Sequence, residues 1–160
     1  MRKILAVLMF LSFAAAGWAN EFDKVDRAAL IQRALDVQSK SYAPYSKFNV
    51  AAAALFDSGE IYTGVNVENS SFPAGICAER TTISHAVASG ERRLIAIAIV
   101  GGANCVISDY CAPCGVCRQT MREFGKPEEV LIIMAKNPTD YVEKTLEELL
   151  PMSFGPDSIK

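Results

Sequence analysis

The chain has 160 residues, which suits one domain with a single hydrophobic core. Hydrophobic residues make up 51% and charged residues 21% of the sequence, a balance typical of globular proteins and not of disordered ones. The formal net charge at pH 7 is -2 and no run of lysine or arginine occurs, so we expect no nucleic-acid partner and favour a small-molecule substrate.

Residues 1–19 have the pattern of a secretory signal peptide. Arg2 and Lys3 are followed by an apolar stretch, and small residues stand at the cleavage positions before and at Ala19. The apolar stretch has about 13 residues, fewer than the roughly 20 that span a bilayer, which argues against an uncleaved anchor. We therefore predict cleavage after Ala19, an exported protein without stable membrane association, and one domain over residues 20–160.

The rest of the chain alternates between helical and strand patterns. In chain order we expect a helix over 23–41, a hairpin of strands over 48–56 and 61–67, a helix over 77–89, a strand over 94–100, a helix over 114–124, strands over 129–135 and 141–144, and a short helix over 146–150. Asp23 is the expected cap of the first helix, and Pro113 begins the third. This order predicts an α/β fold of three layers, α/β/α, with a mixed sheet of about five strands and helices on both faces.

Two short segments carry the residues of a catalytic zinc site. A catalytic zinc takes three protein ligands and keeps its fourth position for water. Cys114 and Cys117 are three residues apart at a helix start, so their sulfur atoms can converge on one ion, and Cys77 comes from another helix start. Helix N-termini favour thiolates because of their free N–H groups and dipole. We therefore predict one zinc ion, held by Cys77, Cys114 and Cys117.

Three charged or titratable residues follow Cys77 on its helix. Glu79 is not needed to complete the metal site and suits proton transfer between water and substrate. Three thiolates leave the zinc centre with a net charge of about -1, and Arg80 is placed to offset it by a hydrogen bond to a thiolate. His85 is the only histidine, and it lies too far along the helix axis to share this metal, so we interpret it as a packed or surface residue.

The cysteines also allow other interpretations. A structural zinc site would need a fourth ligand, for which Cys111 is the first candidate and Cys105 a weaker one. Cys114 and Cys117 alone would match a thioredoxin-like redox pair, but that leaves Glu79 unexplained. Outside the metal site, Cys105 and Cys111 either form a disulfide or stay as free thiols.

At this point the chain resembles a known family. A ligand-x-Glu segment followed by Pro-Cys-x-x-Cys is the pattern of zinc nucleobase deaminases. Five segments extend the likeness to cytidine deaminases that act on free nucleosides: YAPYSKF (42–48), NVEN (66–69), GICAERT (75–81), CGVCRQ (114–119) and LLPMSFGP (149–156). The resemblance covers roughly residues 25–157.

The resemblance implies a cytidine-deaminase-like fold and a homotetramer with one zinc per subunit. The activity it implies is the hydrolysis of cytidine and deoxycytidine to uridine and deoxyuridine plus ammonia, in pyrimidine salvage. It leaves the preference between the two nucleosides open. This family normally works in the cytosol, which is the alternative to export. A nucleic-acid-editing deaminase of the same superfamily is the runner-up, and the absence of a basic patch argues against it.

The resemblance also implies roles for individual residues. Glu79 would be the catalytic proton carrier, with Arg80 compensating the thiolates. The substrate would be held by Phe48, Asn66, Glu68, Ala78 and Phe154. Asn66 and Glu68 would bind the ribose hydroxyls, and Phe154 would enter a neighbouring subunit's site. Beside the ribose segment, Asn69 begins an N-glycosylation sequon, and we expect it to be buried enough to stay unmodified unless the source is bacterial.

Overall fold

The structure is a computed structural model that describes residues 22–159. The predicted signal peptide, residues 1–19, lies outside this range, so its cleavage and the export of the protein stay predictions. Between residues 22 and 159, none of the helices combines the length and the apolar character needed to cross a bilayer.

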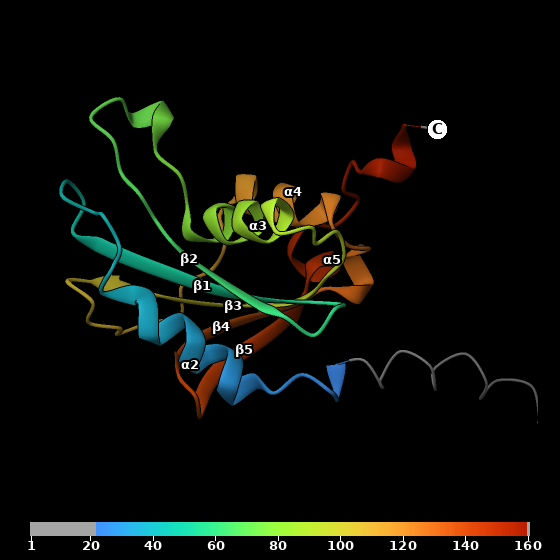
Figure 1. Ribbon diagram of the computed structural model, residues 1–160, viewed down its shortest axis with the longest axis horizontal. Helices are drawn as coiled ribbons and strands as arrows, with labels where there is room; N and C mark the ends of the chain where they lie inside the picture. Colours follow the sequence, from blue (N-terminus) through green and yellow to red (C-terminus); the bar gives the residue numbers. More distant parts are fainter. Residues whose placement is uncertain (1–21, 160) are drawn as a thin grey trace, which may run out of the picture.

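A five-stranded mixed sheet forms the centre of the fold (Figure 1). Its strands, in the spatial order β2-β1-β3-β4-β5, are β2 (Ile61–Val65), β1 (Phe48–Phe56), β3 (Leu94–Ala103), β4 (Leu131–Asn137) and β5 (Asp140–Thr145). β3 and β4 are parallel, and the other neighbouring pairs are antiparallel. The predicted mixed sheet of about five strands is confirmed.

Helices cover both faces of the sheet. One face carries α3 (Ala78–Ala88), α4 (Gly115–Glu123) and the short α5 (Leu146–Leu149), and the other carries α2 (Arg27–Gln38). Short 3₁₀ turns follow the chain at η1 (Phe72–Ala74), η2 (Pro127–Glu129) and η3 (Pro156–Ser158). The α/β/α arrangement is therefore confirmed, with α3 and α4 side by side on the face that holds the site.

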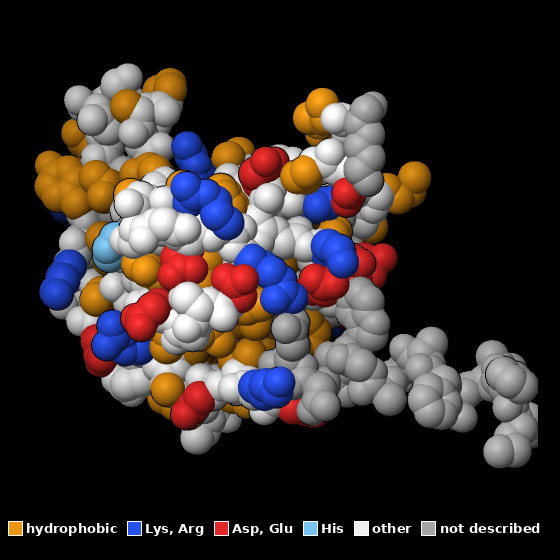
Figure 2. Space-filling view, turned by 45° about the vertical axis from the view of Figure 1, so that its right-hand side comes forward, with side chains coloured by type: hydrophobic (Ala, Val, Ile, Leu, Met, Phe, Trp, Pro, Cys, Tyr) orange, Lys and Arg blue, Asp and Glu red, His pale blue; other side chains and the backbone are white. Residues whose placement is uncertain are grey.

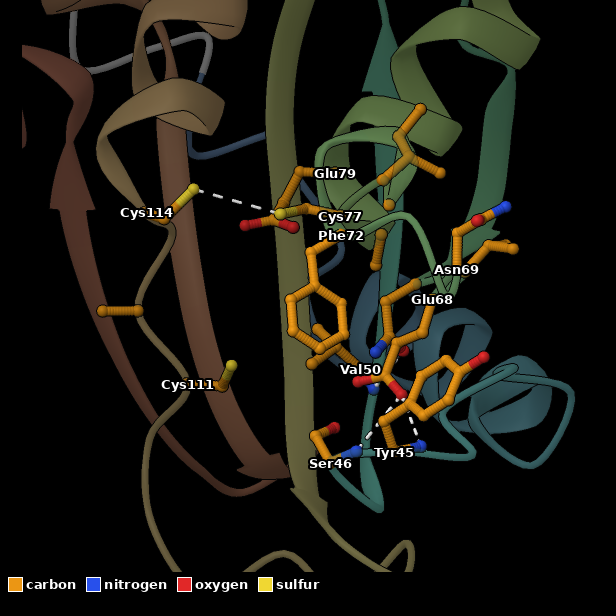
Figure 3. A pocket seen from close by; sticks show the side chains of 16 residues that line it. Tyr45, Ser46, Val50, Glu68, Asn69, Phe72, Cys77, Glu79, Cys111 and Cys114 are labelled. Atoms are coloured by element: carbon orange, nitrogen blue, oxygen red, sulfur yellow. Dashed lines mark hydrogen bonds between the residues drawn. The ribbon is translucent and has the colours of Figure 1, made fainter.

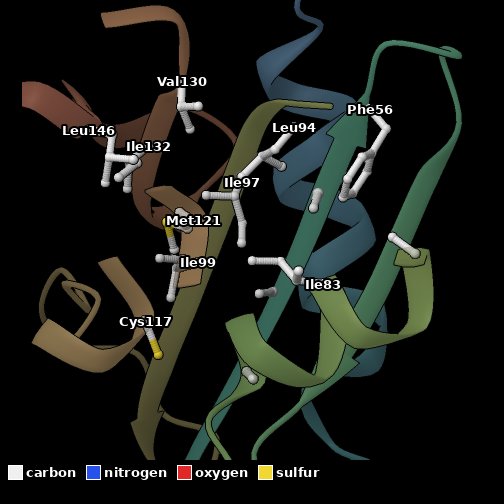
Figure 4. Packing of buried hydrophobic residues seen from close by; sticks show 14 of the residues in the cluster. Phe56, Ile83, Leu94, Ile97, Ile99, Cys117, Met121, Val130, Ile132 and Leu146 are labelled. Atoms are coloured by element: carbon white, nitrogen blue, oxygen red, sulfur yellow. The ribbon is translucent and has the colours of Figure 1, made fainter. Parts of the chain in front are cut away.

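The two faces have separate hydrophobic cores because the central strands are buried on both sides. On the α3–α4 face, the fully buried side chains include Ile83, Ile97, Ile99, Met121 and Ile132 (Figure 4). The stretch 51–54 in β1 is four alanines, and all are buried. These small side chains leave room for α2 on one face and α3 on the other to pack close to the sheet.

Most element boundaries differ from the sequence prediction by one or two residues, and the differences are larger at the first predicted helix and at the end of β3. The helix predicted over 23–41 begins at Arg27, as α2, and its cap is Asp26, whose side chain accepts a hydrogen bond from the backbone N–H of Ala29 at 2.9 Å. The prediction of Asp23 as the cap was therefore wrong. β3 continues to Ala103 because its glycines, which suggest a loop, still pair through their backbone with β1.

Gly64 of β2 allows the first turn of α3 to lie directly on the sheet. A Cβ atom at this position would lie 2.5 Å from the backbone N of Thr82 and 2.7 Å from its Oγ1. Thr82 is fully buried, and its hydroxyl donates to the carbonyl oxygens of Ala78 at 2.8 Å and Ala52 at 3.2 Å. The start of α3, which carries the site, is thus fixed against β1 and β2.

Replacing Gly64 with alanine should lower the free energy of unfolding by about 1–3 kcal/mol, because the methyl group overpacks this contact. Urea denaturation measures the change. Ser84→Ala, on the exposed side of α3, is the control and should shift stability by less than about 0.5 kcal/mol. Equal free energies of unfolding for the Gly64→Ala and wild-type proteins would show that the start of α3 can shift to accept the methyl group without loss of stability.

Candidate active site

A pocket of about 610 Å³ opens where α3 and α4 begin (Figure 3). Its walls come from the start of β1, the segment 66–76 that follows β2, and the loop before α4. Sixteen residues line it, and none of them is lysine or arginine. Functional side chains from distant parts of the chain therefore meet in one cavity.

Three thiols meet beside the pocket: Cys77 and Cys114 line it, and Cys117 is fully buried next to them. Cys77 and Cys114 are the N-cap residues of α3 and α4, and Cys117 lies in the first turn of α4. The Sγ atoms of Cys77 and Cys114 are 4.0 Å apart, those of Cys114 and Cys117 are 3.5 Å apart, and all three lie within 4.8 Å of one another. Neither Cys77 nor Cys114 makes an N-cap hydrogen bond with its side chain, so neither sulfur atom is used to cap its helix.

This cluster fits a zinc ion. Zn–S bonds of about 2.3 Å in tetrahedral geometry separate the sulfur atoms by about 3.8 Å, close to the distances seen here. Among the residues that the structure describes, this is the one group of three or more Cys, His, Asp or Glu side chains that can converge on a metal ion. Zinc is therefore the metal that the donor set fits, with three protein ligands and one open position.

Glu79 stands beside the thiols on the pocket wall (Figure 3). It is the second residue of α3 and is only 4% exposed. Burial raises the pKa of its carboxyl above the ordinary value for glutamate, because the charged form loses hydration. A carboxyl group with a raised pKa, within reach of the metal position and outside the ligand set, suits both accepting and returning a proton.

Glu68 lies on the opposite wall and is held by backbone groups. Its Oε2 atom accepts hydrogen bonds from the backbone N–H groups of Tyr45 at 2.9 Å and Ser46 at 3.2 Å (Figure 3). The Ser46 side chain and the Tyr45 backbone lower the pKa of Glu68, so its carboxylate is ionised at neutral pH. A carboxylate accepts about four hydrogen bonds, so this one keeps capacity for a substrate hydroxyl.

Asn66 also lines the pocket, but much of its amide is engaged by the protein itself. Its Oδ1 atom accepts from the backbone N–H of Val50 at 2.8 Å and from the Ser41 hydroxyl, and its Nδ2 donates to the carbonyl of Phe48 at 2.9 Å. These bonds continue the pairing of β1 after β2 has ended at Val65. The amide keeps one N–H for a ligand, and its ribose-binding role stays a prediction.

The other predicted site residues lie in different places. Ala78 is buried at the start of α3 and lines the pocket. Phe48 is 42% exposed and is not among the residues that line the pocket; its ring lies next to Gly101, as does the pocket-lining Cys111. Phe154 is 62% exposed and does not line the pocket of its own chain.

Arg80 shows no contact of the kind that we expected. It is half-buried on α3, and within residues 22–159 no hydrogen bond or ion pair joins it to a thiol of the cluster. Its charge-compensating role therefore stays a prediction.

Asn69 also differs from expectation, because it is exposed at the pocket and not buried.

Several pocket residues were not assigned a role from sequence. The exposed Phe72, on η1, stands over the pocket and packs edge-on against Tyr45, with ring centroids 6.2 Å apart. Phe72 stands out in the sequence as an aromatic residue in an otherwise polar loop, and this could have indicated a role at the site. The backbone N–H groups of Tyr45 and Ser46 had no such signal, because any residue except proline supplies one.

The structure bears on two other interpretations of the cysteines, a structural zinc site with a fourth thiolate and a disulfide between Cys105 and Cys111. Cys111 lies outside the thiol cluster, so the described residues supply no fourth thiolate for a closed structural site. Cys111 is half-buried, Cys105 is exposed, and both are free thiols. His85 is exposed on α3, where its ring meets Tyr62 edge-on with centroids 5.3 Å apart. Its assignment as a packed or surface residue is confirmed.

Comparison with known proteins agrees with this site. Residues 24–134 match the family model described as the cytidine and deoxycytidylate deaminase zinc-binding region. The cytidine deaminase of Halalkalibacterium halodurans is 38% identical over 130 residues, which cover 81% of this chain and 95% of the relative. That of Mycobacterium tuberculosis is 39% identical over 135 residues, covering 84% and 94%.

Solved structures give the same result at the level of the fold. The crystal structure of the cytidine deaminase from Burkholderia pseudomallei has a TM-score of 0.71 and 41% identity, covering 79% of this chain and 97% of that one. The Mycobacterium leprae enzyme has a TM-score of 0.68 and 39% identity, covering 81% and 100%. On the matched zinc-binding region, the sequence identity and the fold together, this chain belongs to the cytidine deaminase family.

Proposed function

We propose that this protein hydrolyses cytidine and deoxycytidine to uridine and deoxyuridine, with release of ammonia, in the salvage of pyrimidine nucleosides. The observation that carries the proposal is the convergence of three thiols and the buried Glu79 carboxyl on one pocket. The opposite wall, with Glu68 and Asn66, supplies hydrogen-bonding groups suited to a sugar diol.

Cys77, Cys114 and Cys117 would hold the zinc ion, which when bound lowers the pKa of a water molecule and makes it a nucleophile at neutral pH. Glu79 accepts the proton that the water loses as its oxygen adds to carbon 4, and gives this proton to ring nitrogen 3. Glu79 then moves the remaining proton of the added hydroxyl to the amine at carbon 4. The carbon–nitrogen bond breaks, ammonia leaves and a carbonyl remains.

A direct assay tests this function. The purified protein is incubated with cytidine, and the loss of ultraviolet absorbance is followed with and without a chelator. We expect turnover that the chelator abolishes and added zinc restores. A zinc-loaded, folded protein that leaves both cytidine and deoxycytidine unchanged would refute the proposal.

The pocket charge favours nucleosides over nucleotides. Its lining includes two glutamates and no lysine or arginine, and Glu68 is ionised. A 5′-phosphate would therefore meet like charge without a cationic partner, at a cost of several kcal/mol. We expect kcat/KM for deoxycytidylate to be about 100-fold or more below that for deoxycytidine, measured by the same assay. Comparable values for the two substrates would contradict this assignment.

A homotetramer is the assembly that we propose for this chain. Two projections rise on the α3–α4 face: the segment 66–76 at one end and the C-terminal strap, residues 151–159, at the other (Figure 1). Both carry hydrophobic side chains (Figure 2), and Phe72 and Phe154 are 78% and 62% exposed. Such exposed aromatic side chains on one face of the molecule are available for contact with a partner subunit. In this assembly Phe154 completes the pocket of a neighbouring subunit.

Sedimentation of the zinc-loaded protein measures its assembly. We expect about four times the mass of one chain at micromolar concentration, and a fully active monomer would contradict the shared site.

N-terminal sequencing of the protein from its native source would test the predicted cleavage after Ala19.

A further inference from the structure

We propose that Arg122 is a positioning residue that holds the C-terminal strap so that Phe154 points in the direction a neighbouring pocket requires. This inference rests on the proposed function, in which Phe154 serves a site in another subunit. Arg122 lies in the last turn of α4 and touches neither the thiols nor the pocket. It would act on the reaction only through the strap.

Arg122 is the centre of a set of contacts around Phe154. The residue is buried, with 7% of its surface exposed. Nε donates to the hydroxyl of Ser153 at 3.2 Å, and Nη2 pairs with the carboxylate of Asp157 at 3.2 Å. The two partners lie on either side of Phe154 in the chain. A planar guanidinium holds two such partners at a fixed angle, which a lysine ammonium does not.

Gly155 lets the strap lie against this guanidinium. A Cβ atom at Gly155 would be 2.4 Å from Cζ and 2.6 Å from Nε of Arg122. Such a close approach is possible only for a residue without a side chain. The backbone that carries Phe154 therefore passes directly over the arginine head group.

Gln119 adds a third attachment, one turn before Arg122 on α4. Its Nε2 donates to the carbonyl oxygen of Phe154 itself at 2.9 Å. The backbone of Phe154 is thus tied to the helix, although the ring is 62% exposed. Hydrogen bonds on both sides of Phe154 fix the direction in which its Cα–Cβ bond leaves the strap, although they bury little of the ring.

The element that carries these attachments also carries the metal site. α4 begins after Cys114, includes Cys117 in its first turn, and presents Gln119 and Arg122 to the strap. A single rigid helix thereby relates each subunit's thiols to its own Phe154. In a symmetric assembly of identical subunits, this relation determines where Phe154 meets the neighbouring pocket.

The test is a double-mutant cycle on the zinc-loaded full chain with cytidine as substrate. Arg122→Met should raise KM by about 2–10-fold and change kcat by less than about twofold, because a misdirected ring loses its contact with bound substrate. Phe154→Ala should raise KM at least as much. The double variant should match Phe154→Ala alone, since Arg122 acts through that ring. Arg122→Lys should give an intermediate KM.

Arg33→Met, at an exposed position on α2, is the control and should leave both constants unchanged. Hydrogen exchange gives a second readout: the amides of Ser158 and Ile159, bonded within the strap at 2.8 Å and 3.2 Å, should exchange faster in Arg122→Met than in wild type. If Arg122→Met does not fold, Ser153→Ala, which removes only the Nε partner, replaces it in the cycle.

Two results would overturn the inference on an active enzyme. One is an unchanged KM in Arg122→Met, and the other is a KM effect of Arg122→Met that multiplies in full with that of Phe154→Ala. An unchanged KM in Phe154→Ala would instead remove the shared-site part of the proposed function, and the inference with it. Absence of turnover by zinc-loaded wild type would refute the proposed function itself.

Discussion

Replacing Glu79 with glutamine should lower kcat for cytidine by about 10⁴-fold and leave the zinc content unchanged. Glutamine keeps the size of the side chain and its place on α3, but it cannot accept the proton that water loses. Proton transfer by a positioned group contributes about 10²–10⁴-fold, and we expect the upper end because Glu79 serves both transfers. The carboxyl is buried on the pocket wall, so bulk water reaches it poorly as a substitute.

The measurement combines steady-state kinetics with metal analysis of the same sample. Glu60→Gln, an exposed glutamate beyond the end of β1, is the matched control and should turn over cytidine at the wild-type rate. Loss of zinc together with activity in Glu79→Gln would mean that Glu79 is a ligand and that its assignment as a proton carrier is wrong.

Removal of zinc should abolish turnover and lower the thermal midpoint of the protein. A ligand present at about 1,000 times its Kd stabilises the folded state by about 4 kcal/mol, and chelation removes this contribution. Without the metal, the three sulfur atoms also lose the bonds through which the ion would join the starts of α3 and α4. The same result is expected from Cys114→Ala, because two thiols and a methyl group no longer complete the ligand set.

Cys105→Ala is the control for this experiment, since Cys105 is an exposed free thiol outside the cluster. It should keep full zinc content, wild-type kcat and an unchanged thermal midpoint. Deamination at the wild-type rate by chelated protein, with metal analysis showing no zinc, would contradict the role of the thiol cluster.

Much of the fold follows from local patterns in the chain. The bounds of β1, Phe48–Phe56, agree with the predicted strand 48–56, because an apolar run between turn residues has few alternatives. The predicted cap Asp23 was wrong, since two nearby aspartates have the same local signal and packing selects Asp26. The continuation of β3 through Gly101 and Gly102 depends on pairing with β1, a partner far away in the sequence.

The sequence alone indicated the type of chemistry at the site. The spacing of Cys114 and Cys117 at a helix start, and of Cys77 and Glu79 at another, indicated a three-thiolate metal site with a separate proton carrier. These are relations between residue types within one turn of chain, which local geometry determines.

Only the tertiary structure decided how these parts meet. It brought Cys77 to within 4.0 Å of Cys114, held Glu68 on the backbone of Tyr45 and Ser46, and placed Phe72 over the pocket. The sheet order and the close contact at Gly64 are responsible, because they set two helix starts side by side. Such contacts join residues far apart in the chain, and no local pattern specifies which backbone groups will be neighbours.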